Sequence, residues 1–175
     1  MSAIDNTPSN RNFLSPLNFR FTLRRAPHIN FFLQKVSLPQ VNINPTPVYN
    51  NLLIDIPLAG EFVTFAPLTI SFKVDEDLQN YLEIFNWIKA LGDYGRDGDY
   101  AKLQNAAPGS DKGLYSDISL MVLSSTKMPN YEITFMDAFP VSLTALPFNT
   151  IDSDVNYVEA QAEFRYTIFE FNNIT

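Results

Sequence analysis

The sequence contains no cysteine, which excludes disulfide bridges and thiol chemistry. It has one histidine, His28, so a histidine-rich metal centre is excluded and a Ser–His–Asp group has a single candidate base. No apolar run approaches the roughly 20 residues that a membrane-spanning helix needs. Residues 1–10 are polar and lack the basic-then-apolar pattern of a signal peptide, so we expect the chain to be assembled in a cytosol.

Basic residues are also scarce, and the formal net charge is −7. This balance argues against a free-standing DNA-binding module, which needs a basic face to release counterions from phosphates. It is compatible with a surface that DNA slides past without binding. The hydrophobic content of 46% is typical of a globular domain, and the 15 Phe and 8 Tyr favour β structure.

One stretch, residues 68–91, organises the rest of the chain. Alternating apolar residues predict a strand over 68–74, and three- and four-residue spacing then predicts a helix over about residues 76–91. Asp75 and its acidic neighbours can accept hydrogen bonds from the first N–H groups of that helix. Two apolar faces are predicted. One, expected against a sheet, comprises Leu78, Tyr81, Leu82, Phe85 and Ile88; the other, either core or a contact with another subunit, comprises Ile84, Trp87 and Leu91.

Other strands are predicted from period-two alternation of apolar and polar residues. They cover residues 18–25 and 28–36, expected as a hairpin, then 117–125, 131–136, 141–145 and a long final strand over 155–171. The sequence therefore predicts a mainly β domain with one long helix. The final strand has a polar outer face, as the wall of a continuous sheet or barrel requires.

Three segments lack this periodicity. Residues 1–16 form an N-terminal arm, residues 37–66 form an extended loop with a short strand at 52–56, and residues 92–113 form an irregular insertion. Prolines at 45 and 47 argue against a central strand in the extended loop. Long ordered loops of this kind usually carry contacts or function.

Catalytic arrangements are scarce. His28 lies at the edge of the predicted hairpin, and the acidic run 75–77 lacks the ligand spacing of a calcium-binding loop. Glu159 and Glu163 share a strand face that we interpret as solvated. The glycines at 92–98 follow a helix and lack the Gly-Lys-Ser/Thr of a phosphate-binding loop. We therefore expect neither an enzyme nor a metal or cofactor site.

Several stretches together resemble the tail tube proteins of contractile-tailed bacteriophages. They are Lys35-Val36-Ser37-Leu38-Pro39, the Pro45–Pro47 loop with Leu52 to Ile56 and Ala59-Gly60, the strand ending in Asp75-Glu76-Asp77, and the helix bearing Phe85, Trp87 and Ile88. The likeness covers roughly residues 18–91 and rests on the joint order of these motifs. It implies that residues 17–175 are a single tail-tube-like domain, with two packed antiparallel sheets forming a barrel-like sandwich flanked by the helix.

The resemblance also implies a non-enzymatic structural subunit. Six copies would form a ring, and stacked rings would form a tube in a virion tail, assembled in the host cytoplasm. Partners would be further copies, sheath and baseplate proteins, with DNA passing through unbound and no membrane. Alternatives of the same fold are a baseplate or tail-end ring protein and the tube of a contractile secretion or injection device.

Residues can be assigned to these expected contacts. The inter-ring contact would comprise Pro45, Pro47, Leu52, Leu53, Ile54, Ile56 and Gly60; the helix and subunit contact Ile84, Trp87 and Leu91; and the channel lining Glu159, Gln161, Glu163 and Thr167.

Overall fold

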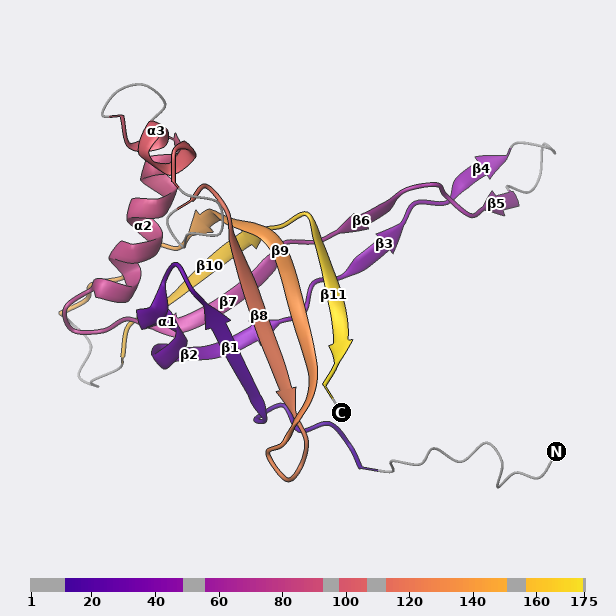
Figure 1. Cartoon of the computed structure of the whole chain (residues 1–175), viewed down its shortest axis with the longest axis horizontal. Helices are drawn as coiled ribbons and strands as arrows, with labels where there is room; N and C mark the ends of the chain where they lie inside the picture. The colour runs from indigo at the N-terminus through magenta and orange to yellow at the C-terminus, as the bar shows by residue number, and fades with distance from the viewer. Residues whose placement is uncertain (1–11, 49–55, 93–97, 107–112, 151–156, 175) are drawn as a thin grey trace.

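The computed structural model describes residues 12–48, 56–92, 98–106, 113–150 and 157–174. The strands are β1 (Phe19–Leu23), β2 (Leu33–Ser37), β3 (Val41–Ile43), β4 (Thr46–Val48), β5 (Ile56–Leu58), β6 (Val63–Phe65), β7 (Leu68–Lys73), β8 (Ser116–Leu123), β9 (Pro129–Leu143), β10 (Glu159–Arg165) and β11 (Ile168–Asn173). The helices are α1 (Pro27–Phe32), α2 (Gln79–Gly92) and α3 (Asp99–Gln104). Figure 1 shows a two-sheet body from which a long two-stranded arm projects.

The two sheets of the body share β9. Sheet A consists of β1, β8, the first part of β9 and β11; sheet B consists of the last part of β9, β10, β7 and β2. All these pairs are antiparallel, which confirms the predicted mainly β, two-sheet architecture. Among the described strands β1 and β2 end the path without pairing to each other. The sheets therefore do not close into a barrel, and the barrel-like part of the prediction is not confirmed.

The core lies between the inner faces of the two sheets, and α2 covers part of it. Its buried apolar residues are Phe21, Leu23, Ala26, Ile29, Leu68, Ile70, Phe72, Ile84, Trp87, Ile118, Leu120, Ile133, Phe135, Ala138, Ala160, Ala162 and Phe164. The strict alternation of buried and half-buried residues in β7 follows the predicted pattern. The period-two reading of that strand is therefore confirmed.

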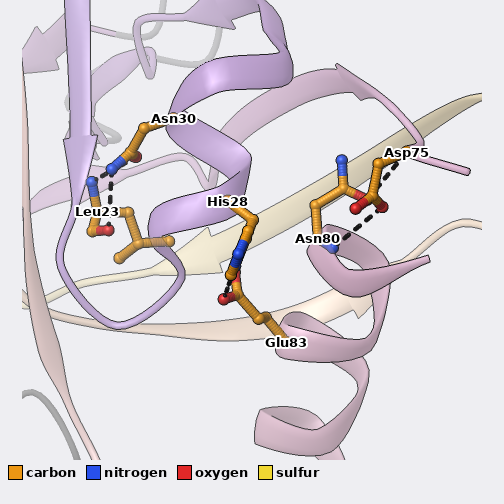
Figure 2. Close-up of polar contacts among 6 residues, drawn as sticks. All are labelled: Leu23, His28, Asn30, Asp75, Asn80 and Glu83. Carbon is orange, nitrogen blue, oxygen red and sulfur yellow. Dashed lines mark hydrogen bonds and ion pairs between the residues drawn. The ribbon is translucent and has the colours of Figure 1, made fainter. Parts of the chain in front are cut away.

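The predicted hairpin between residues 18–25 and 28–36 is wrong. β1 pairs with β8 and β2 pairs with β7, and the helix α1 lies between them. Asn30 explains the difference, because its Oδ1 accepts from the Leu23 N–H at 2.8 Å and its Nδ2 donates to the Leu23 carbonyl at 3.3 Å. These bonds occupy the Leu23 N–H and carbonyl at the end of β1, as Figure 2 shows. Pro27 occupies the first turn of α1, where its missing N–H costs nothing.

The last third of the chain also departs from prediction. β9 runs unbroken through Pro140, where two separate strands were expected. The final strand is instead divided into β10 and β11 by a bend at Tyr166 and Thr167. The Tyr166 ring packs against Phe135 at 5.1 Å between centroids, and its hydroxyl donates to the Ala66 carbonyl at 2.9 Å. The chain passes from sheet B into sheet A at this anchored ring. Burial raises the pKa of the Tyr166 hydroxyl.

The insertion at 92–113, expected to be irregular, contains the short helix α3. Gly98 precedes it with φ of 69°, a left-handed conformation that glycine adopts without strain. No helix among the described residues is long and apolar enough to cross a membrane.

Candidate assembly surfaces

The arm, defined here as residues 38–67, is built from two short ribbons. β3 pairs with β6, and further out β4 pairs with β5. Residues 52–55 of the predicted strand at 52–56 lie outside the described residues, and Ile56 begins β5. Because opposite residues of an antiparallel pair share a face, the β3–β6 register gives the ribbon one polar and one apolar face. The apolar face carries Val41, Ile43, Val63 and Phe65.

Most of that apolar face has no cover. Val41, Ile43 and Val63 are all about half exposed, whereas Phe65 packs on Phe169 at the body, with 5.4 Å between ring centroids. Phe62, just before β6, is 76% exposed. An isolated two-stranded ribbon is marginally stable in water, so covering this face would stabilise the arm.

Of the seven residues assigned to the inter-ring contact, the structure describes four, and all four lie on this arm. Pro45 is exposed between the ribbons, while the backbones of Pro47 and Ile56 belong to the β4–β5 ribbon. Leu52, Leu53 and Ile54 lie outside the described residues. Gly60 lies where the two ribbons meet, and a Cβ built there would lie 1.6 Å from the Asn44 carbonyl oxygen. Only glycine allows so close an approach of the two chains.

Sheet B presents a polar face away from the core. The strand registers place Glu159 opposite Lys73, Gln161 opposite Ser71, and Glu163 opposite Thr69. Gln34 joins the first row: in the amide orientation that satisfies both neighbours, it donates to Glu159 Oε1 at 3.0 Å and accepts from Lys73 Nζ at 3.3 Å. Three of the four expected channel-lining residues therefore lie in line on one face.

Thr167 does not lie on that face. It belongs to the bend between β10 and β11, where its N–H donates to the Met136 carbonyl at 3.0 Å. Its hydroxyl donates to Asp137 Oδ2 at 3.4 Å. The broken final strand is the cause, because alternation along β10 does not continue through the bend.

Of the two predicted apolar faces of α2, the one with Ile84 and Trp87 belongs to the core, and the one expected against the sheet is only partly covered. Ile84 and Trp87 are buried inside the subunit, while Leu82 and Phe85 are among the exposed hydrophobic residues. Trp87 Nε1 donates to the Leu114 carbonyl at 3.2 Å, and the Arg25 guanidinium lies 4.6 Å from its ring centroid. Burial lowers the pKa of Arg25. Ile84 and Trp87 are therefore not available for a contact with another subunit.

Leu91, the third residue of that predicted contact, is half-buried and packs against the core. It also lines an open depression near the end of α2, together with Tyr100, Tyr115 and Phe139. Apolar residues surround most of α2, so their spacing alone does not predict which of them are buried most deeply.

The corner between β7 and α2 is held by polar contacts. Asp75 Oδ1 accepts from the Asn80 N–H at 3.3 Å, which confirms the predicted carboxylate at the helix start. Asn80 is fully buried, and its Nδ2 donates to the Lys73 carbonyl at 2.7 Å. Figure 2 shows Asp75 and Asn80 beside His28 and Glu83, the pair that joins α1 to α2. The described residues contain no group of three or more acidic or histidine side chains arranged to hold a metal ion.

His28 Nδ1 and Glu83 Oε1 lie 2.5 Å apart. The hydrogen bond to Glu83 raises the pKa of His28, and the charges of Glu83 and then Asp75 act in the same direction. Glu83 Oε2 is buried and has no hydrogen-bond partner in the described part of the chain. The pair thus links two helices and uses the single histidine for structure.

A further apolar surface was missed from the sequence. Leu146, Phe148 and Val158 combine with Val74 and Leu78 around an open pocket of about 250 Å³, with Asp75 and Glu76 at its edge. We name it the far-end pocket. Its residues come from the β7–α2 turn and from both sides of the segment between β9 and β10. The one available signal was Phe148, an aromatic residue in a stretch without strand alternation.

A family model matches almost the whole chain. The family model for "Phage tail tube protein" matches residues 7–172, and the chain belongs to that family. Tail tube proteins are structural, so the chain is a structural protein and not an enzyme, as predicted. A search of curated protein sequences finds no match.

Solved structures share the fold at low sequence identity. The tube-terminating cap of the anti-feeding prophage has a TM-score of 0.59 and 12% identity, covering 99% of both chains. A chain of the PVC sheath–tube complex, an extracellular contractile injection system, has a TM-score of 0.57 and 10% identity over 94% of both chains. Hcp1 from Flavobacterium johnsoniae has a TM-score of 0.52 and 10% identity, covering 92% of this chain and 96% of its own.

Proposed function

We propose that this protein is the repeating subunit of a contractile phage tail tube, in which stacked hexameric rings surround a channel for DNA. The observation that carries the proposal is the incomplete sheet B. Among the described strands β2 pairs only with β7, and residues 139–143 of β9 pair only with β10. Both edges of this four-stranded sheet are therefore free to add strands from neighbouring copies.

Joining these two different edges gives a head-to-tail contact. Such contacts close into a ring when a whole number of copies, each rotated by the same angle, completes a full turn. Six copies of a four-stranded sheet would supply about 24 strands. At a spacing of about 4.8 Å they span a circumference of roughly 115 Å, hence a diameter of about 37 Å before strand tilt widens it. That leaves a channel wide enough for duplex DNA after side chains are added.

The polar face of sheet B suits the channel wall. Every other residue along β10 points to it, and Glu159, Gln161 and Glu163 occupy successive positions. Lys73 pairs opposite Glu159, and Lys35 stands opposite Ser71 on the same side, so this part of the face carries both signs of charge. The acidic excess of the whole chain is not concentrated here. Mixed charge without a basic stripe supports passage of DNA without tight binding.

The proposed role as a tail tube subunit also implies a location and partners for the chain. The chain would be a virion tail component assembled in the host cytoplasm, with sheath and baseplate proteins as partners, in line with the PVC sheath–tube complex and the anti-feeding prophage baseplate whose chains share the fold. A baseplate or tail-end ring protein, or the tube of an injection device, would use the same ring. Copy number per particle distinguishes a tube subunit, present in many rings, from a terminal ring.

The experiment is to purify the protein and record its mass and its images over a range of concentrations. Rings of about six times the 19.9 kDa chain, or tubes with a central channel, are expected in native mass spectrometry and negative-stain microscopy. A chain that stays monomeric at high concentration would contradict the proposal.

The edge itself is tested with two neighbouring proline variants in β2, Val36→Pro and Ser37→Pro. Adjacent N–H groups of a strand point to opposite sides, so one variant removes a bond to β7 and the other removes only an outward donor. The variant that removes only the outward donor is expected to keep the folded subunit but to lose rings. Rings formed normally by both variants would show that the β2 edge is not the contact.

A further inference from the structure

An exposed aromatic side chain, Phe31, lies beside the edge strand that the proposed ring contact uses. It is 84% exposed, at the end of α1 and two residues before β2 begins. The Phe32 ring meets it edge-on, with 4.9 Å between ring centroids. Exposure alone does not distinguish Phe31, because single apolar side chains are common on protein surfaces. Its position next to the free edge of sheet B does, since a strand that joins there comes close to it.

The contacts of α1 direct Phe31 away from the body. His28 pairs with α2, Ile29 is fully buried in the core, and Asn30 hydrogen-bonds to the end of β1. Residues two apart in a helix differ by about 200° around its axis, so Phe31 points away from the core that Ile29 enters. Because α1 is fixed on three sides, Phe31 loses little further conformational freedom when it binds a partner.

This outward direction leads towards a neighbouring copy in the proposed ring. Among the described strands, β1 and β2 are the two ends of the continuous path through sheets A and B, and α1 connects them. The helix therefore covers the side of the subunit at which β2 has its free edge, as Figure 1 shows. A copy that joins the β2 edge meets Phe31 on that side.

The helix α2 spans the subunit from α1 to the opposite edge of sheet B. In its first half Glu83 binds α1, and near its end Leu91 lies with Phe139 and Pro140 of β9 around an open depression. These two β9 residues belong to the segment 139–143, which forms the other free edge of sheet B. We name this hollow the α2 depression. It lies next to one free edge of the sheet, and Phe31 lies next to the other.

The α2 depression suits an aromatic side chain. Its volume is about 380 Å³, and Tyr100, Leu114 and Tyr115 also line it. Tyr115 is 51% exposed and meets the Phe139 ring edge-on, with 5.7 Å between ring centroids. None of the described residues that line the depression carries a charge. Aromatic rings favour edge-on and offset neighbours, so a further ring is stabilised in such a site.

We propose that Phe31 of one copy inserts into the α2 depression of the next copy in the same ring. The inference deepens the proposed function and rests on it, since both surfaces adjoin the strand edges that join there. Both also belong to one layer, because α1 buries Ile29 and α2 buries Trp87 in the core, on the side of sheet B away from its polar face. Rotation about the ring axis keeps this layer at one radius, so Phe31 of one copy faces the end of α2 in the next.

An anchor of this kind makes the joint between copies specific. Backbone hydrogen bonds at a free strand edge can be made by almost any other strand, whereas a side chain in a pocket selects one partner and one register. The anchor is also apolar, because no charged side chain lines the depression. Rings are therefore expected to persist at salt concentrations that screen exposed charges.

The experiment measures the protein concentration at which half of the chains are in rings, by native mass spectrometry. Phe31→Ser is expected to raise that concentration about ten-fold or more, and Phe31→Leu by less, because leucine keeps part of the apolar contact. Both variants should keep the melting temperature of the unassembled subunit, since the side chain is exposed there. Met128→Ser, at a 65% exposed position on the β8–β9 turn, is the control and should assemble like the wild type.

A second variant tests whether the α2 depression is the receptor. Tyr115→Ser removes an exposed aromatic side chain from it, so the double variant Phe31→Ser/Tyr115→Ser should assemble no worse than the weaker of the two single variants. Effects that simply multiply would overturn the inference, and so would Phe31→Ser protein that forms rings as readily as the wild type. In both cases the rings of the wild type would leave the proposed function standing. Wild-type protein that forms no rings would contradict the proposed function itself, and the inference with it.

Discussion

The buried side chain of Asn80 ties the start of α2 to the end of β7 by donating through Nδ2 to the Lys73 carbonyl oxygen, 2.7 Å away. The same side chain accepts from the Asp75 N–H at 3.4 Å. A strand that ends inside the body leaves backbone groups without ladder partners, and here one amide satisfies two of them. The Asn80 side chain therefore contributes two of the hydrogen bonds that hold the junction between sheet B and the helix.

Asn80→Ala is expected to lower the free energy of unfolding by about 1–3 kcal/mol, because the fully buried Asn80 side chain is removed and the Lys73 carbonyl loses its donor. Denaturant unfolding followed by the fluorescence of the single tryptophan, Trp87, measures the change. Protein concentration must be equal in all samples, since assembly adds to apparent stability. Asn86→Ala, an exposed position on the same helix, should change stability by less than about 0.5 kcal/mol. Equal losses in the two variants would contradict the role of Asn80.

The difference in burial between Ile84 and Leu82 on α2 gives a second prediction. Ile84→Ala removes fully buried side-chain volume and is expected to cost about 2–5 kcal/mol of unfolding free energy. Leu82→Ala, on the exposed face two residues away, should cost less than about 1 kcal/mol in the unassembled subunit. Thermal unfolding of the two variants side by side decides between the faces. A larger loss for Leu82→Ala than for Ile84→Ala would contradict the burial of Ile84 in the core.

Sequence patterns predict the elements whose burial is one-sided. β7 and β8 alternate cleanly because each has one face in the core, and the extent of α2 follows from its spacing and from Gly92 at its end. The same patterns fail where a single tertiary contact decides. Period-two alternation continues through Tyr166, but its ring is held by Phe135 and bends the chain there. Nothing in the local spacing reveals that partner.

The candidate surfaces divide in the same way, into one that a local sequence pattern predicts and others that depend on contacts between distant segments. The polar row of Glu159, Gln161 and Glu163 is visible in the sequence because it lies within one strand. The far-end pocket is not, since Val74, Leu146 and Val158 come from three separate segments that meet only in the fold. The apolar face of the arm was hidden for a related reason: it depends on the register between β3 and β6. Long-range pairing, not residue type, defines these surfaces.

Gly60 gives a third prediction. Gly60→Ala places a Cβ against the Asn44 backbone, and backbone atoms on both sides cannot move without separating the two strands of the arm. We expect the body to keep its melting temperature within about 2 °C, since few body contacts involve this site, while stacking of rings is lost. Gly92→Ala is the matched control, because a Cβ there meets nothing within 4 Å. Normal tubes from Gly60→Ala protein would show that arm geometry at this point is not needed.

The pair of His28 and Glu83 predicts a pH dependence whose sign is fixed by the direction of the shift. Glu83 raises the pKa of His28 in the folded state, so protonated His28 favours folding. This contribution is fully present below the unfolded pKa of about 6.5 and is lost as pH rises through the higher folded pKa. His28→Gln should therefore lower the melting temperature more at pH 5.5 than at pH 8.5, measured against the wild type at each pH. Because the chain has one histidine, NMR titration of its imidazole reports the folded pKa directly, with a midpoint expected above 6.5. In Glu83→Gln the midpoint should return towards 6.5; an unchanged midpoint there would assign the shift to other charges.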